Sequence, residues 1–156
     1  MAAKIAFFDL DGTLVSSNVV HQYDWYARAS GDFKRRLRLA CDLPRLGWLE
    51  FRSRRRFNEA FFRHYAGLRQ SWLVENAPRM FLQLLQPALY PGAPLLVEKN
   101  RRDGFLTVLL TGSLDFAVQP LAERLQFDRV VSNRLVFENG VATGQLVAPI
   151  VDRKSV

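Results

Sequence analysis

The chain has 156 residues, of which 49% are hydrophobic and 12% aromatic, and a formal net charge of +7. This length and composition allow one sizeable core but not two independent domains of usual size. The apolar runs are too short for a membrane span or a signal-peptide core, and a single cysteine, Cys41, excludes an internal disulfide. We therefore expect one soluble folding unit in the cytoplasm, with Cys41 as a small buried residue.

The hydrophobic pattern predicts strands that alternate with helices, apart from one long helical segment near the N-terminus. In chain order, we expect a buried strand over 4–10, helices over 19–86 with a distortion near Pro78, a helix over 93–103 capped by Gly104, a strand over 105–110, a helix over 115–125, a strand over 128–131, and a hairpin turning at Asn139-Gly140. Such alternation indicates a parallel sheet with right-handed crossovers. The predicted fold class is α/β, a Rossmann-like parallel sheet with an inserted α-helical segment and a β-hairpin near the C-terminus.

The positive charge is concentrated in that helical segment. Residues 28–69 contain twelve Lys or Arg and four Asp or Glu, a balance of +8 against +7 for the whole chain. The simplest interpretation is that these cations form the solvated faces of amphipathic helices. One or two of the arginines could instead clamp a phosphorylated substrate, and a basic binding module for anionic lipid or nucleic acid is a further alternative.

Two aspartates follow the first predicted strand. Asp9 and Asp11 are two residues apart on an extended backbone, so both side chains project from the same side. Asp9 can then attack an electrophile while Asp11 transfers protons, and Gly12 allows a sharp turn beside the ligand. Ligands of parallel sheets bind at the carboxyl ends of the strands, where these acids fall.

A second polar group, residues 111–113 with the sequence TGS, ends the strand over 105–110. We expect the hydroxyl of Thr111 and the backbone amides of Gly112 and Ser113, at a helix start, to hold an anionic oxygen. With Gly12, these residues form the predicted phosphate-binding set.

The stretches FFDLDGTL (7–14) and VLLTGS (108–113) resemble the first two motifs of the haloacid dehalogenase-like phosphohydrolases. The helical insertion resembles the cap of the branch that contains phosphoserine phosphatase. The resemblance implies that Asp9 is the nucleophile that forms an aspartyl-phosphate, and that Asp11 protonates the leaving oxygen and later activates water. It also implies Mg²⁺ as the cofactor, held by the Asp9 carboxylate and the Asp11 carbonyl, and Lys154 as the catalytic lysine of the third motif.

The chain also departs from the family pattern. It reaches Val156 before the acidic pair of the fourth motif. We therefore expect an incomplete core (1–17 and 89–156) with a cap (18–88). We also expect weak magnesium binding, little or no turnover, and self-association through an exposed first strand over residues 4–10. Asn18 stands where phosphoserine phosphatases carry a glutamate for the substrate's ammonium group, which argues against phosphoserine.

The function implied by the resemblance is Mg²⁺-dependent hydrolysis of a small phosphorylated substrate. A catalytically impaired relative that lacks the fourth motif is the alternative within the family. The basic binding module named above is the alternative outside it, and we do not expect nucleic acid as the partner.

Overall fold

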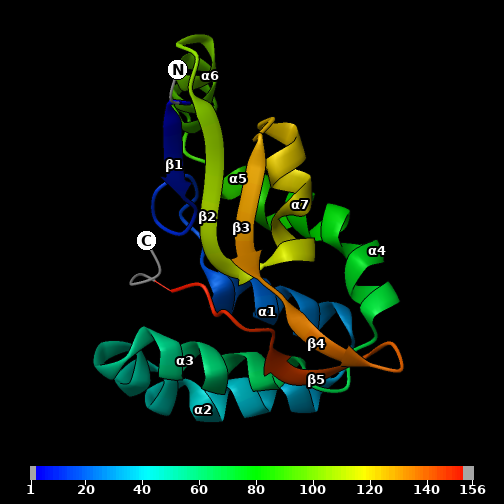
Figure 1. Cartoon of the computed structure of the whole chain (residues 1–156). Coiled ribbons are helices and arrows are strands. Elements are labelled where there is room, and N and C mark those ends of the chain that lie inside the picture. The colour runs from blue at the N-terminus through cyan, green and yellow to red at the C-terminus, as the bar shows by residue number, and fades with distance from the viewer. Residues whose placement is uncertain (1–2, 153–156) are drawn as a thin grey trace.

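The computed structural model describes residues 3–152, and its elements follow the predicted order (Figure 1). The strands are β1 Ile5–Asp9, β2 Leu106–Leu114, β3 Arg129–Asn133, β4 Leu135–Glu138 and β5 Val141–Leu146. The helices are α1 Val19–Ala29, α2 Phe33–Arg52, α3 Arg54–Phe61, the 3₁₀ helix η1 Phe62–Tyr65, α4 Gln70–Met80, the π-helix η2 Phe81–Leu85, α5 Gln86–Ala88, α6 Ala93–Arg102 and α7 Asp115–Arg124.

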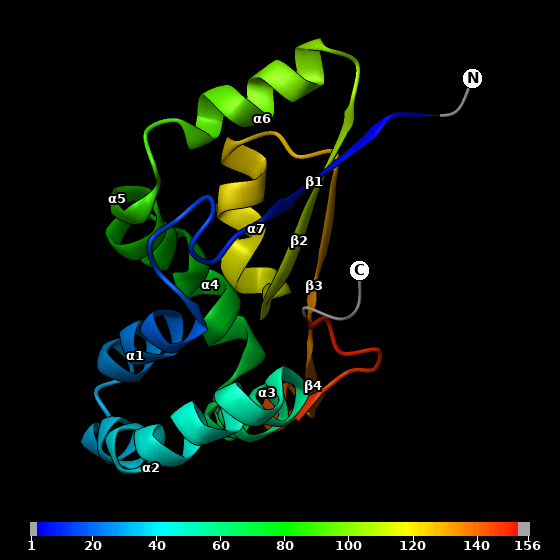
Figure 2. The ribbon, with the colours of Figure 1, turned by 90° about the vertical axis from the view of Figure 1, so that its left-hand side faces the viewer.

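The first three strands form the predicted parallel sheet, and their order is β1-β2-β3. Helices α6 and α7 lie on one face of this sheet, and among residues 3–152 no helix packs on the other (Figure 2). The prediction of a buried first strand is therefore wrong in part. Within residues 3–152 β1 is an edge strand, and Phe7 on the open face is 59% exposed, whereas Phe8 on the helix-covered face is buried.

The chain between β1 and α6 is helical, as the pattern predicted. Helix α1 begins at the N-cap Asn18, whose Oδ1 accepts hydrogen bonds from the amides of Val20 (3.0 Å) and His21 (3.1 Å). The helical segment is distorted close to the predicted place, but Pro78 itself lies within regular α4, and the irregular turn is the π-helix η2 after it. Proline lacks an amide hydrogen and crowds the preceding turn, so Pro87, which follows η2, accounts for the distortion better than Pro78 does.

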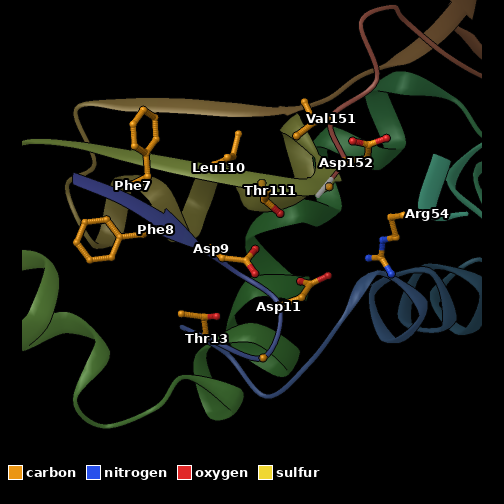
Figure 3. Close-up of a pocket in the computed structure, with 12 residues that line it drawn as sticks. Phe7, Phe8, Asp9, Asp11, Thr13, Arg54, Leu110, Thr111, Val151 and Asp152 are labelled. Atoms are coloured by element: carbon orange, nitrogen blue, oxygen red, sulfur yellow. The ribbon is translucent and has the colours of Figure 1, made fainter. Parts of the chain in front are cut away.

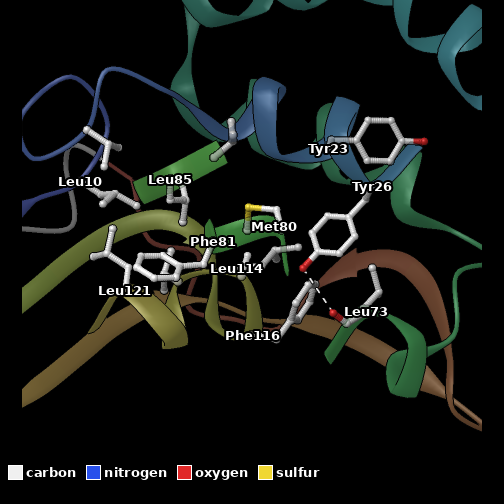
Figure 4. Packing of buried hydrophobic residues seen from close by; sticks show 14 of the residues in the cluster. Leu10, Tyr23, Tyr26, Leu73, Met80, Phe81, Leu85, Leu114, Phe116 and Leu121 are labelled. Carbon is white, nitrogen blue, oxygen red and sulfur yellow. Dashed lines mark hydrogen bonds between the residues drawn. The ribbon is translucent and has the colours of Figure 1, made fainter. Parts of the chain in front are cut away.

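Aromatic side chains fill the space between the helices and the sheet. The stripe of Phe57, Phe61 and Tyr65, predicted to belong to the core, is buried. Tyr26 is fully buried as well and donates a hydrogen bond to the carbonyl of Leu73 at 3.3 Å (Figure 4). One continuous core therefore joins the helical insertion to the sheet.

The predicted turn residues are confirmed. Asn139 and Gly140 have φ of 50° and 75° between β4 and β5, which matches the left-handed pair of a type I′ hairpin turn. Gly104 has φ of 80° directly after α6, and the amide of Phe105 donates to the carbonyl of Asn100 at 3.0 Å, as in a Schellman cap.

Two further expectations are corrected. β2 continues to Leu114, so residues 111–113 lie within a strand and α7 begins only at Asp115. Cys41 is exposed on α2 rather than buried. The boundaries of core and cap stay a prediction: α2 and α3 lie beyond the carboxyl ends of the strands, whereas α4 packs against α7.

Within residues 3–152, no helix combines the length and the apolar content that crossing a bilayer requires.

Candidate active site

A cleft of about 750 Å³ opens at the carboxyl ends of β1 and β2. It is lined by Phe7, Phe8, Asp9, Asp11, Gly12, Thr13, Arg54, Leu110, Thr111, Gly112, Val151 and Asp152 (Figure 3). Four separate parts of the chain thus meet here: the end of β1 with its turn, the end of β2, α3, and the C-terminal segment.

The turn after β1 holds the two aspartates on the side of the cleft. Leu10 between them is fully buried, so its side chain anchors the turn in the core while Asp9 and Asp11 face the opening. Gly12 has φ of 73°, a left-handed conformation that favours glycine, and its amide donates to the carbonyl of Val15 at 2.8 Å. The expected sharp turn is therefore present.

Asp11 is the electrostatically unusual group of the cleft. Burial raises the pKa of its carboxyl from 3.8 to about 6, and the nearby Asp9 contributes to the increase, while the Arg54 guanidinium opposes it. The buried Oδ1 of Asp11 has no hydrogen-bond partner among the described residues. A carboxyl with such a pKa can donate a proton and later accept one near neutral pH.

Arg54 is the residue that α3 contributes to the cleft. It is the first residue of this helix, forms an ion pair with Glu50, and its guanidinium lies 5.0 Å from the centroid of the Phe57 ring. Arg54 is one of the twelve cations of residues 28–69, among which the sequence alone selects no single arginine as a substrate clamp. No sequence signal separates Arg54 from Arg55 and Arg56, because only the packing of α3 decides which of them faces the cleft.

The polar end of β2 is shaped by a bulge. Leu110 pairs with Val131 but Leu114 pairs with Asn133, so the intervening TGS residues are out of regular register with β3. Bulges of this kind are frequent beside active sites, where they redirect backbone and side-chain groups. Thr111 and Gly112 line the cleft as a result.

The predicted phosphate-binding residue Ser113 has other contacts. Its amide donates to the Thr111 Oγ1 at 3.0 Å, and its own Oγ accepts from the Gln22 Nε2 at 3.0 Å. Its side chain is fully buried against α1 and does not line the cleft. The structure therefore brings together Asp9, Asp11, Gly12, Thr111 and Gly112, whereas Ser113 lies behind them and Lys154 lies outside the described residues.

Asn133 is a positioning residue that sequence analysis missed. Its Nδ2 donates to the carbonyls of Gly112 (2.9 Å) and Val151 (3.2 Å), and its Oδ1 accepts from the Val151 amide at 2.7 Å. This buried side chain ties the C-terminal segment to the bulge of β2. Its place at the carboxyl end of the third parallel strand was the available signal.

The oxygen atoms of the cleft suit a hard cation. The exposed Asp9 carboxylate lies in this cleft. Asp11, whose backbone carbonyl the resemblance assigns to the metal, and Asp152 also line it. Among residues 3–152, no group of three His, Cys, Asp or Glu side chains is arranged to hold a metal. Mg²⁺ is commonly bound by only one or two carboxylates, with waters and substrate phosphate oxygens completing its coordination. The donor set therefore fits a magnesium ion that is shared with a phosphorylated ligand.

The family model of the haloacid dehalogenase-like hydrolases matches residues 6–155. The chain belongs to this family. One curated relative is the phosphoserine phosphatase SerB2 of Mycobacterium tuberculosis, which is 30% identical over 96% of this chain and 33% of the relative. Another is the phosphoserine phosphatase of Methanocaldococcus jannaschii, which is 22% identical over 95% of this chain and 64% of the relative. This hydrolase-family chain thus spans between a third and two thirds of the length of those relatives.

Solved structures support the fold assignment. A phosphoserine phosphatase structure with an analogue of the phospho-aspartyl intermediate has a TM-score of 0.68 at 19% identity, covering 97% of this chain and 66% of that one. A protein of unknown function from Bordetella pertussis has a TM-score of 0.79 at 18% identity, covering 95% and 68%. The α/β fold with its parallel sheet and helical insertion is that of this haloacid dehalogenase-like family, in its phosphoserine phosphatase-like form.

Proposed function

We propose that this family member hydrolyses the phosphomonoester of a small molecule with Mg²⁺, through an aspartyl-phosphate formed on Asp9. The observation that carries the proposal is the meeting of Asp9, Asp11, Thr111 and Gly112 in one cleft at the ends of two parallel strands. We place the activity in the cytoplasm, where the exposed thiol of Cys41 stays reduced.

The proposed roles follow from the position and charge of each group. An Asp9 carboxylate oxygen attacks phosphorus, the bond from phosphorus to the ester oxygen breaks, and protonated Asp11 gives its proton to that oxygen. The Asp11 carboxylate then takes a proton from the water that attacks the aspartyl-phosphate, which releases phosphate and restores Asp9. Thr111 and Gly112 are placed to bind the phosphoryl oxygens, and the role of Lys154 stays a prediction.

Magnesium held by the Asp9 carboxylate and the Asp11 backbone carbonyl would neutralise phosphate charge in this cleft. We therefore expect phosphate release from a generic substrate such as p-nitrophenyl phosphate to require Mg²⁺, to stop when EDTA is added, and to return when Mg²⁺ is restored. Release of inorganic phosphate is the measurement, and circular dichroism of the EDTA-treated sample is the control for folding. Activity that EDTA leaves unchanged would contradict the metal dependence, and a folded chain without turnover would favour the catalytically impaired alternative.

We also propose that the site does not recognise an ammonium group on its substrate. The Oδ1 of Asn18 accepts the hydrogen bonds that cap α1, and Asn18 is not among the residues that line the cleft. A phosphomonoester with an amine, such as phosphoserine, should therefore have a kcat/KM no higher than that of a phosphomonoester of similar size without one, such as 3-phosphoglycerate. A substrate panel measures this, and a clear preference for phosphoserine would contradict it.

Self-association through β1 is proposed as well. Within the described residues β1 pairs only with β2, and Ile5 on this edge strand is exposed. Unprotected edge strands of this kind pair with other chains, and a charged side chain on the strand hinders such pairing. We expect sedimentation velocity to show association that increases with concentration and decreases in Ile5→Lys. A wild-type chain that stays monomeric at all concentrations would contradict the proposal.

A further inference from the structure

Helix α2 presents an apolar stripe to solvent. The outer stripe, as we name it, consists of Phe33, Leu37, Pro44, Trp48 and Phe51. These positions recur at i, i+4, i+11, i+15 and i+18, so they share one face of the helix. Phe33, Trp48 and Phe51 are 68%, 58% and 89% exposed, whereas Leu39 and Leu46 on the opposite face are buried in the protein core. A continuous exposed apolar stripe of this length marks an interaction surface rather than scattered surface residues.

Positive charge borders the outer stripe. Lys34, Arg45 and Arg52 recur at i, i+11 and i+18, the spacing of the stripe itself, and so form a row beside it. The Arg52 guanidinium lies 5.3 Å from the centroid of the Trp48 ring, which places this cation at the margin of the apolar surface.

The two acids of α2 offset this row only at Arg45. Asp42 lies 3.4 Å from the Nη1 of Arg45 and also contacts the Nε2 of His64 at 3.0 Å, whereas Glu50 is paired with Arg54 of α3. The helix contains six basic residues against these two acids. Its outward face is therefore apolar in the middle and cationic along its border.

We propose that the outer stripe of α2 docks this protein on an anionic lipid surface, with the helix lying in the plane of the interface. Helices that bind membrane surfaces combine Trp, Phe and Leu on one side with Lys and Arg beside them, and their remaining face is polar. Anionic headgroups neutralise a border of cations, and the apolar side chains enter the boundary between headgroups and acyl chains. Two copies joined stripe to stripe with antiparallel helices would instead bring their rows of cations together, which is unfavourable.

The position of α2 in the molecule allows this docking. Figures 1 and 2 both place α2 at the end of the molecule opposite α6, so the sheet and its helices do not cover it. Phe51 and Arg52 at its C-terminal end also line a cavity of about 910 Å³ that shares Arg54 with the active-site cleft. A molecule docked through α2 would hold this side of the cleft close to the headgroup layer. The docking itself does not depend on the proposed phosphatase activity.

Vesicle flotation with the whole chain tests the proposal. We expect the protein to float with vesicles that contain phosphatidylserine and to bind much less to pure phosphatidylcholine. The fluorescence emission of Trp48 should shift to shorter wavelength on binding, and Trp48→Phe should keep the binding while losing that part of the shift. Trp48→Ser with Phe51→Ser should lower the partition onto phosphatidylserine vesicles about tenfold or more, because two apolar side chains no longer enter the interface.

Matched variants distinguish binding through the outer stripe from nonspecific binding by exposed apolar residues. Leu95→Ser with Leu96→Ser removes comparable exposed apolar area from α6, where these residues are 69% and 50% exposed, and should leave vesicle binding unchanged. Lys34→Glu with Arg52→Glu should lower binding to phosphatidylserine vesicles selectively. Thermal unfolding followed by circular dichroism confirms that each variant folds.

Several results would overturn the proposal. The proposal is wrong if wild-type protein does not float with phosphatidylserine vesicles. It is also wrong if the Trp48→Ser, Phe51→Ser variant floats as well as wild type does. A dimer that this double variant dissociates, without vesicle binding, would assign the stripe to a second copy of the chain. Binding to duplex DNA without vesicle binding would assign the cationic border to nucleic acid.

Discussion

Asp9→Asn is expected to abolish phosphate release while leaving the fold intact. The amide that replaces the carboxylate lacks the charge and nucleophilicity needed to attack phosphorus, and loss of a covalent nucleophile lowers kcat by a factor on the order of 10⁴ or more. The fold should tolerate the change, because Asp9 is exposed and its Oδ1 accepts one hydrogen bond, from the Leu10 amide at 2.8 Å. The oxygen of an asparagine amide can accept the same bond. Steady-state phosphate release and thermal unfolding measure the two effects.

Asp115→Asn is the matched control for this experiment. The Oδ1 of Asp115 accepts a hydrogen bond from the amide of the next residue, Phe116, at 2.8 Å, as Asp9 does with Leu10, but Asp115 does not line the cleft. This variant should keep wild-type turnover. If Asp9→Asn retained wild-type turnover as well, the nucleophile would have to be another residue, and the proposed mechanism would be wrong.

The sequence was sufficient for the parts of the site that local rules determine. Asp9, Asp11 and Gly12 lie in one short stretch, where the alternation of a strand and the left-handed turn of a glycine decide the geometry. The parallel sheet followed from the alternation of strands and helices, and strands of such a sheet end at a common edge. The meeting of Asp9 with Thr111 could therefore be predicted without a structure.

The parts that sequence analysis missed depend on contacts between distant segments. Ser113 turns away from the cleft because Gln22, on α1, bonds its hydroxyl. The strand continues through residues 111–113 because β3 pairs with Leu114 beyond the bulge. Arg54 differs from its basic neighbours only in the direction that the packing of α3 gives it. No local pattern in the sequence predicts any of these three contacts.

Asp11→Asn is expected to lower activity and to raise stability at neutral pH. The activity should fall by a factor on the order of 10² to 10⁴, because an amide can neither donate the proton to the leaving oxygen nor accept one from water. The stability should rise because the Asp11 carboxylate is buried, close to Asp9, and has an Oδ1 without a partner among the described residues. An amide at this position carries no charge to desolvate.

The pKa of Asp11 determines the pH at which this stabilisation is seen. Its value in the folded protein is about 6, above the ordinary 3.8, so between these values the folded state binds more protons than the unfolded state. The free energy of unfolding then falls as pH rises through this window. Below pH 3.8 and above pH 6, Asp11 adds little to its pH dependence. A raised pKa of this size corresponds to about 3 kcal/mol at most, so we expect Asp11→Asn to raise the free energy of unfolding by about 1–3 kcal/mol at neutral pH.

Urea unfolding in EDTA measures this effect without bound metal. The difference between Asp11→Asn and wild type should be largest at pH 7, shrink as the pH is lowered from 6 to 4, and level off below that range, where the carboxyl of the wild type is protonated in both states. Asp115→Asn shows how the loss of a carboxylate outside the cleft changes the free energy of unfolding. That change should not depend on pH in the way described for Asp11→Asn between pH 4 and 6. An Asp11→Asn variant that is less stable than wild type at pH 7, or whose stability difference does not depend on pH, would show that the buried carboxylate does not destabilise the fold.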